Sequence, residues 1–299
     1  MRLQAGDTAL EVDDRGLPSG EPLLMIMGLG MQLIGWPEEL VDDLVARGFR
    51  VIRLDNRDAG LSQGFDHLGT PNLPYAALRF TLRMQVHAPY SLADMASDAL
   101  GVLDALGIER AHVCGASMGG MIAQHLAAEH PERLRSLTLV MSTSGARRLP
   151  QARARVQRAM LSRPDGRDPL AVEAYLIRLL RLIGSPGYPP DAERLRSRIH
   201  QMVSRAWRPA GTARQLAAVA ADGDRTPMLA RISAPTHVIH GLDDPLVPVA
   251  AGHDLAALIS GATLDIVPGM GHDLPLPLLA RIADGIEGNA ARWDGRGAA

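Results

Sequence analysis

Lysine is missing from this 299-residue chain, in which every basic side chain belongs to arginine or histidine. Neither a Schiff base on lysine nor a lysine general base can therefore carry its chemistry. Cysteine occurs once, at Cys114, so an intrachain disulfide cannot form, as is usual for cytoplasmic proteins. Aromatic residues make up only 3% of the chain, so aliphatic side chains and 13 methionines must fill the core.

The sequence also shows no pattern typical of a secretory leader, no long apolar run and no strong net charge. The chain opens with the polar stretch MRLQAGDTALEVDD, and no apolar segment is long enough to span a membrane. The formal net charge of -2 gives no general reason to expect nucleic-acid binding. These absences predict a cytoplasmic protein, with export as the open alternative, and leave a small molecule, not a nucleic acid or a membrane, as the expected partner.

Strand-like and helix-like patterns alternate through most of the chain. This alternation predicts an α/β fold, with a mostly parallel central sheet and helices on both faces. The strand-like segments are short apolar runs at 22–28, 49–56, 111–117, 134–142, 234–241 and 262–269. The segments with helical spacing lie at 37–48, 91–108, 118–131 and 274–287.

The alternation stops between residues 144 and 228, where helical patterns dominate. We expect residues 144–228 to form a helical cap inserted before the penultimate strand, and residues 1–143 and 229–299 to form the core domain. The cap holds 16 of the 31 arginines against seven acidic residues. This charge would suit an anionic substrate or surface, but pairing with the acidic core is the interpretation we prefer. An exposed cap also offers a surface for a homodimer.

A second long connection, residues 64–90, concentrates apolar side chains outside the predicted sheet. Connections of this length are uncommon without a function. Two roles are open: a pocket wall or lid, or a surface helix that buries one apolar face. The residues concerned are Tyr75, Leu78, Phe80, Leu82 and Met84.

The sequence GASMG around Ser117 lies between a predicted strand and a predicted helix. In this setting G-x-S-x-G is typical of a nucleophile elbow, a sharp turn that lifts a serine hydroxyl above the sheet. Its neighbours are small because strand and helix must approach closely. Met118 is the first residue of the predicted helix, so its amide is free to bind a developing oxyanion. Ser117 is the candidate nucleophile; a structural serine in a glycine-rich turn is the alternative.

A catalytic serine needs a base and an orienting acid, which follow in the chain order aspartate then histidine in this arrangement. The motif IHGLDDPLVP supplies two adjacent carboxylates directly after a predicted strand. We favour Asp244, because DPLVP places it in the loop beyond the strand, and keep Asp243 as the alternative. His272, in IVPGMGHDLP, follows the last predicted strand through a glycine-rich loop and is the candidate base.

The loop MIMGLGMQLIG, after the first predicted parallel strand, is the expected source of a second oxyanion donor. The amide of Leu29 is our first choice, with Gly30 or Met31 as alternatives. Met-rich walls suit apolar ligands, although methionine in such strands is more often plain core. The candidate pocket residues are Gly28, Gly30, Met31 and Met121.

Five motifs resemble those of the α/β-hydrolase superfamily: MGLGM, DNRDAGLS at 55–62, GASMGG, HGLDDPLVP and PGMGH. The first two, with the intervening QLIGWPEEL, also resemble the anthracycline methylesterases and related bacterial serine esterases. Two positions depart from the family pattern. Met27 stands where histidine is usual, which removes a side chain that often braces the oxyanion loop, and Asp58 stands where glycine is usual.

The resemblance implies hydrolysis of small or medium apolar carboxylic esters through an acyl-enzyme, with no metal or organic cofactor. Serine at position 117 argues against the dehalogenases and epoxide hydrolases of this fold, which use aspartate. The lack of lysine argues against its hydroxynitrile lyases. Carbon–carbon bond hydrolysis, cofactor-free perhydrolysis and ligand binding by a non-catalytic receptor are the alternatives.

Overall fold

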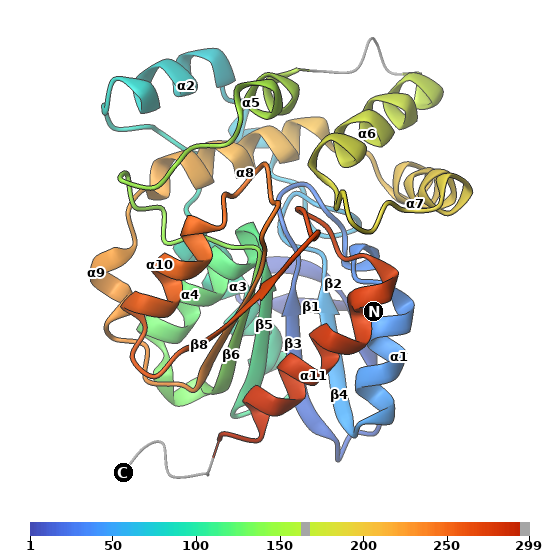
Figure 1. Ribbon diagram of the computed structural model, residues 1–299, viewed down its shortest axis with the longest axis vertical. Helices are drawn as coiled ribbons and strands as arrows, with labels where there is room; N and C mark the ends of the chain where they lie inside the picture. Colours follow the sequence, from blue (N-terminus) through green and yellow to red (C-terminus); the bar gives the residue numbers. More distant parts are fainter. Residues whose placement is uncertain (163–167, 294–299) are drawn as a thin grey trace.

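The computed structural model of this protein describes residues 1–162 and 168–293. Within these residues, eight strands form one sheet in the order β1-β2-β4-β3-β5-β6-β7-β8 (Figure 1). The strands from β3 to β8 pair in parallel, which confirms the predicted α/β fold, while β1 and β2 add an antiparallel edge. The strands are β1 (Arg2–Ala5), β2 (Thr8–Arg15), β3 (Glu21–Ile26), β4 (Phe49–Leu54), β5 (Ala111–Ala116), β6 (Leu134–Val140), β7 (Thr236–Gly241) and β8 (Thr263–Val267).

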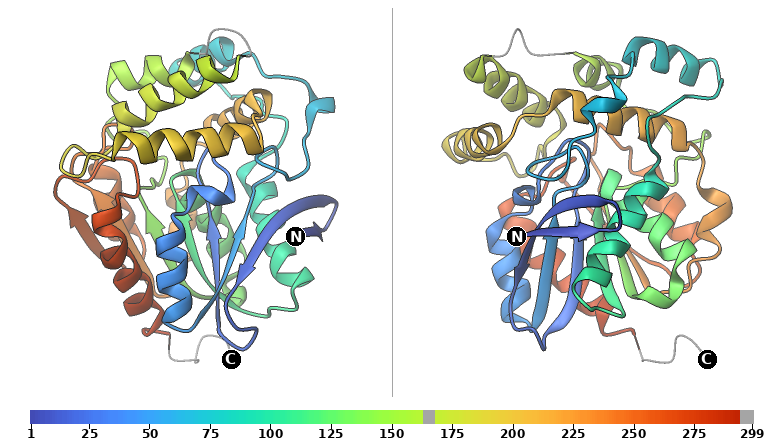
Figure 2. Two further views of the ribbon diagram at one scale, coloured as in Figure 1. Left: turned by 90° about the vertical axis from the view of Figure 1, so that its right-hand side faces the viewer. Right: turned by 180° about the vertical axis from the view of Figure 1, so that it is seen from behind.

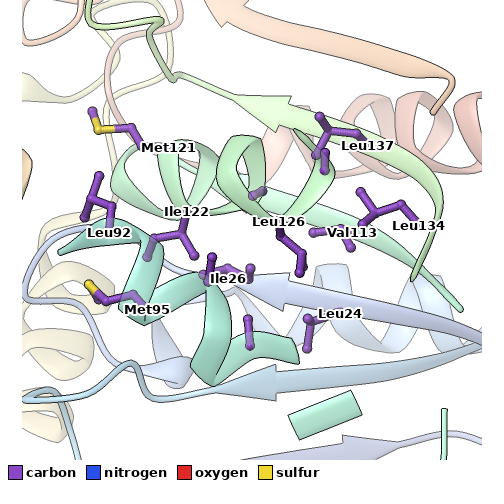
Figure 3. Packing of buried hydrophobic residues seen from close by; sticks show 14 of the residues in the cluster. Leu24, Ile26, Leu92, Met95, Val113, Met121, Ile122, Leu126, Leu134 and Leu137 are labelled. Carbon is purple, nitrogen blue, oxygen red and sulfur yellow. The ribbon is translucent and has the colours of Figure 1, made fainter. Parts of the chain in front are cut away.

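Successive residues of β3 enter two different cores, because side chains alternate between the faces of a strand. Leu24 and Ile26 pack with α3 (Leu92–Ala105) and α4 (Met118–Glu129), as Figure 3 shows, in a cluster that extends to α10 (Ala250–Leu258). Leu23 and Met25 pack with α1 (Glu38–Ala46) and α11 (Leu279–Ala290) on the opposite face. Helices therefore cover both faces, and the carboxyl ends of the parallel strands are left for a site.

In the described part of the segment between β6 and β7, five helices lie over the edge where the parallel strands end (Figures 1 and 2). They occupy the predicted cap, of which residues 163–167 lie outside the described part of the chain. Among the described cap arginines, Arg148, Arg194, Arg205 and Arg214 pair with carboxylates of the core, in line with our preferred interpretation. The helices are α5 (Ala154–Leu161), α6 (Pro169–Ile183), α7 (Ala192–Arg205), α8 (Pro209–Asp222) and α9 (Thr226–Leu229).

The connection at 64–90 contains a helix, α2 (Leu73–Thr81), that packs against α8. Ala76 is its one buried residue, while Tyr75 and Leu78 are each 54% exposed. The segment is thus a surface helix, but it does not bury an apolar face, and its role as a pocket wall or lid stays a prediction.

His112, in β5, is a buried titratable side chain away from the candidate site. It is 3% exposed, its Nδ1 lies 2.9 Å from the Oγ of Ser136, and its ring packs edge-on against Phe49 and Trp293. Burial lowers the pKa of His112 from 6.5 to about 4. The unfolded chain therefore binds a proton at higher pH than the folded protein, so this residue costs stability as the pH falls from 6.5 towards 4.

We expect the variant His112→Leu to lose less stability on acidification than the wild type, by about 3 kcal/mol between pH 7 and pH 4. Urea unfolding at several pH values measures this slope for both proteins. The control changes an exposed side chain that carries no titratable group: Leu17 is 72% exposed, and Leu17→Asn should follow the wild-type slope. Equal slopes for wild type and His112→Leu would contradict the assignment.

Candidate active site

Ser117 occupies a strained turn between β5 and α4. Its φ of 54° and ψ of -118° lie in a backbone region that residues other than glycine rarely adopt. Its amide donates to the carbonyl oxygen of Val140 at 2.9 Å. A Cβ at Gly119 would lie 2.0 Å from the carbonyl oxygen of Ile26. Strand and helix thus approach so closely that the surrounding backbone holds the turn in its strained conformation.

The structure brings Ser117, His272 and Asp244 into one hydrogen-bonded chain. The Oγ of Ser117 lies 3.0 Å from Nε2 of His272, and Nδ1 of His272 lies 2.6 Å from Oδ2 of Asp244. The other carboxylate oxygen of Asp244 accepts the amides of Leu246 and Val247, both at 2.8 Å. The aspartate favours the tautomer with the proton on Nδ1, which leaves Nε2 able to accept the serine proton.

Asp243, the alternative acid, has a different role. Its Oδ2 accepts the amide of Gly269 at 2.9 Å, and its own amide donates to the carbonyl oxygen of Met270. Asp243 therefore braces the turn that leads to His272. Of the two adjacent carboxylates, Asp244 is the one that contacts the imidazole.

The loop after β3 lies against Ser117, where a Cβ on Gly28 would come within 3.2 Å of the serine Cβ. Of its amides, that of Gly30 donates to a glutamine side chain at 2.8 Å and that of Met31 donates to the carbonyl oxygen of Gly28 at 3.1 Å. Both alternative oxyanion donors are thus already engaged.

Two amides next to Ser117 are free to bind an oxyanion. Within residues 1–162 and 168–293, the amides of Leu29 and Met118 donate no hydrogen bond to the protein. Met118 is the first residue of α4, where the helix dipole favours negative charge. The methionine side chains around the turn belong mainly to the hydrophobic core. Met118 and Met121 are part of the cluster that includes α3 and α4, in which Figure 3 labels Met121. Met31 packs against two other clusters. A pocket role for Met31 and Met121 stays a prediction.

Asp58 adopts the backbone conformation that glycine usually supplies at its position in DNRDAGLS. Its φ is 66°, and its carboxylate binds Arg214 of α8 through two contacts of 2.7 Å and Tyr90 through one of 2.8 Å. Burial alone would raise the pKa of Asp58, but the Arg214 guanidinium holds it below its usual range. Asp58 thus joins the core to the cap.

Asp55 of the same motif is fully buried and braces the loop after β3. Its Oδ1 accepts the amide of Leu33 at 2.6 Å, and its Oδ2 accepts the amide of Leu61 and the Arg205 guanidinium at 2.9 and 2.7 Å. Burial raises the pKa of Asp55, and these donors oppose the shift. DNRDAGLS marked this turn as a family motif, but nothing in it pointed to Arg205, 150 residues further along the chain.

The cap also contacts the loop that carries the candidate base. The amide of His272 donates to the carbonyl oxygen of Ile183, the last residue of α6, at 2.7 Å. The Oγ of Ser185 accepts the amide of Gly271 at 2.8 Å and donates to Asp273. Sequence reasoning missed Ser185, which belongs to no recognisable motif, and gave no role to Asp273, although it directly follows His272 in IVPGMGHDLP.

The described residues hold no group of three or more histidine, cysteine, aspartate or glutamate side chains placed to bind a metal ion. In the same part of the chain, no helix has both the length and the hydropathy needed to cross a membrane.

This chain belongs to the α/β-hydrolase fold family, whose model matches residues 21–276. It is 32% identical to rhodomycin D methylesterase DauP of Streptomyces sp. strain C5, over 89% of this chain and 91% of that protein. It is 28% identical to a 2-hydroxy-6-oxononadienedioate/2-hydroxy-6-oxononatrienedioate hydrolase of Paraburkholderia xenovorans, over 91% and 88%. The enol-lactonase structure from Burkholderia xenovorans LB400 superposes with a TM-score of 0.75 at 22% identity, over 98% of this chain and all of that one. The resemblance to methylesterases is confirmed, and hydrolases are the class of enzyme that these relatives define.

Proposed function

We propose that this protein is a serine esterase that hydrolyses carboxylic esters through an acyl-enzyme. The hydrogen-bonded chain from Ser117 through His272 to Asp244, with its contacts of 3.0 and 2.6 Å, carries the proposal. The similarity to a methylesterase over most of both chains supports an ester as the substrate. Small or medium apolar esters are the proposed substrate class.

In the proposed reaction, Nε2 of His272 takes the proton of Ser117 as the Oγ attacks the ester carbonyl carbon. The amides of Leu29 and Met118 stabilise the resulting oxyanion, each donor contributing about 3–4 kcal/mol. His272 then protonates the leaving alkoxide, and water cleaves the acyl-enzyme by the same route. Asp244 holds the imidazole in the required tautomer and stabilises its charged form. The reaction uses neither a metal nor an organic cofactor.

Initial rates on p-nitrophenyl esters from acetate to laurate test the proposal. The variant Ser117→Ala should lose roughly a thousandfold in kcat or more, because the nucleophile is gone while the fold is kept. The dependence on acyl length will then size the pocket.

A wild type no faster than Ser117→Ala on every ester would refute the esterase proposal. Turnover of a dienol-diketone by that wild type would point instead to carbon–carbon bond hydrolysis, the alternative that the similarity to the Paraburkholderia enzyme favours. Ligand binding without turnover of either substrate would point to a receptor.

A further inference from the structure

The side chain of Gln215 connects the cap to the loop that follows β3. Gln215 lies in α8 and is fully buried. Its Oε1 accepts the amide of Gly30 at 2.8 Å, and its Nε2 donates to the carbonyl oxygen of Arg57 at 2.7 Å. Both ends of the side-chain amide are therefore committed, because one partner is a donor and the other an acceptor.

The bond to Gly30 restrains the peptide unit that directly follows Leu29. Gly30 has a φ of 66°, so this loop adopts a conformation that only glycine takes up without strain. Thr212, one turn before Gln215 in α8, packs so closely on Gly30 that a Cβ there would lie 2.9 Å from its side chain. Helix α8 thus sets both the position and the orientation of the peptide beside Leu29.

The loop has separate braces on either side of this point. The carbonyl oxygen of Met27, which stands where the family usually has histidine, accepts the side chain of Asn56 at 2.9 Å. The amide of Leu33 is held by Asp55 at 2.6 Å. Gln215 holds the middle of the loop, nearest to the amide that is free to bind an oxyanion.

We infer that Gln215 is a positioning residue that keeps the Leu29 amide aimed at the oxyanion of the proposed esterase reaction. The inference rests on the proposed function. Gln215 acts through the Leu29–Gly30 peptide and its two hydrogen bonds go to backbone atoms, so its effect is on the transition state and not on substrate recognition.

Helix α8 is anchored independently of Gln215. The neighbouring Arg214 is 1% exposed, and its guanidinium binds both carboxylate oxygens of Asp58 and also Asp66. Loss of the Gln215 side-chain amide therefore leaves α8 in register against the core, and a change in rate reports on the loop.

The test compares Gln215→Leu, Gln215→Glu and wild type on one p-nitrophenyl ester. Gln215→Leu should lower kcat about a hundredfold, the lower end of the loss of one oxyanion donor, with little change in KM. Its affinity for an alkylboronic acid, which forms a tetrahedral anion on Ser117, should fall in parallel with kcat/KM. Gln215→Glu keeps an acceptor for the Gly30 amide and should recover part of the loss when its carboxyl is protonated, because the O–H can then donate to the carbonyl oxygen of Arg57.

Asn289→Leu is the matched control. Asn289 is also a buried side-chain amide, and it donates to the carbonyl oxygens of Leu137 and Pro235 beneath α11. This variant should lower the melting temperature without changing kcat or boronate affinity in the folded protein.

Three results would overturn the inference. A folded Gln215→Leu with wild-type kcat and boronate affinity would show that the loop needs no such brace. If kcat and boronate affinity fall in both Gln215→Leu and Asn289→Leu only in proportion to the unfolded fraction, the role of Gln215 is merely structural. If the wild type is active, either of these two results refutes only the role of Gln215. The third result, an inactive wild type, would refute the proposed function and this inference with it.

Discussion

Asp244→Asn is expected to lower kcat about ten-thousandfold while the protein stays folded. Asparagine would present an amide group to Nδ1 of His272 and so favour the tautomer with the proton on Nε2. That tautomer cannot accept the proton of Ser117. The fold is kept because the asparagine oxygen can still accept the amides of Leu246 and Val247.

Asp243→Asn provides a control with the same chemical change one residue away. Its partner is the amide of Gly269, which an asparagine oxygen also accepts. We expect kcat to stay within about threefold of wild type, as for a substitution that keeps its hydrogen bond. Ester hydrolysis and melting temperature, measured for both variants, give the comparison. A larger loss in Asp243→Asn than in Asp244→Asn would reverse the assignment of the acid.

Gly119→Ala is expected to damage both folding and catalysis. The new Cβ would lie 2.0 Å from the carbonyl oxygen of Ile26 and 2.9 Å from that of Met27, and neither backbone atom can move alone. Strand β3 and helix α4 must separate, which we expect to cost at least the ~1–3 kcal/mol typical of overpacking. The shift would also move the Met118 amide, so the folded fraction should lose most of its kcat.

Gly288→Ala makes the same substitution in helix α11, where, apart from the adjoining residues and the helix's own backbone, no atom of the described residues lies within 4 Å of the added Cβ. Alanine is the better helix former, so this variant should gain roughly 0.5–1 kcal/mol. Urea unfolding of the two variants beside wild type tests both expectations. Stability of Gly119→Ala equal to wild type would show that the elbow is less tightly packed than its geometry indicates.

Local patterns predicted the parallel part of the fold well, because each buried strand is a short apolar run closed by turn residues. The antiparallel edge of β1 and β2 was not predicted. Leu10 and Val12 alternate with charged residues there and are fully buried, but the charges made the segment look uniformly polar. Period-two alternation was the available signal.

Local patterns likewise predicted some residues of the candidate site and missed others. Ser117, Asp244 and His272 lie in short motifs at strand ends, so local sequence was enough to select them, and the structure brings them together. Gln215 and Ser185 act on loops far away in sequence, and no local pattern links residue 30 to residue 215. The presence of aspartate instead of glycine at position 58 is explained only by its ion pair with Arg214, which is distant in sequence.

The contacts of α8 and of residues 183–187 limit how the cap can be diversified in the laboratory. A library for new substrate scope that randomises the whole cap would discard Gln215, Arg214 and Ser185 together, and most members would lose turnover whatever their pocket. Randomising α5 and the first turns of α6, while keeping these three residues, would vary substrate selectivity without changing the contacts that support turnover. A cap grafted from another hydrolase should likewise work only if it supplies equivalent anchors.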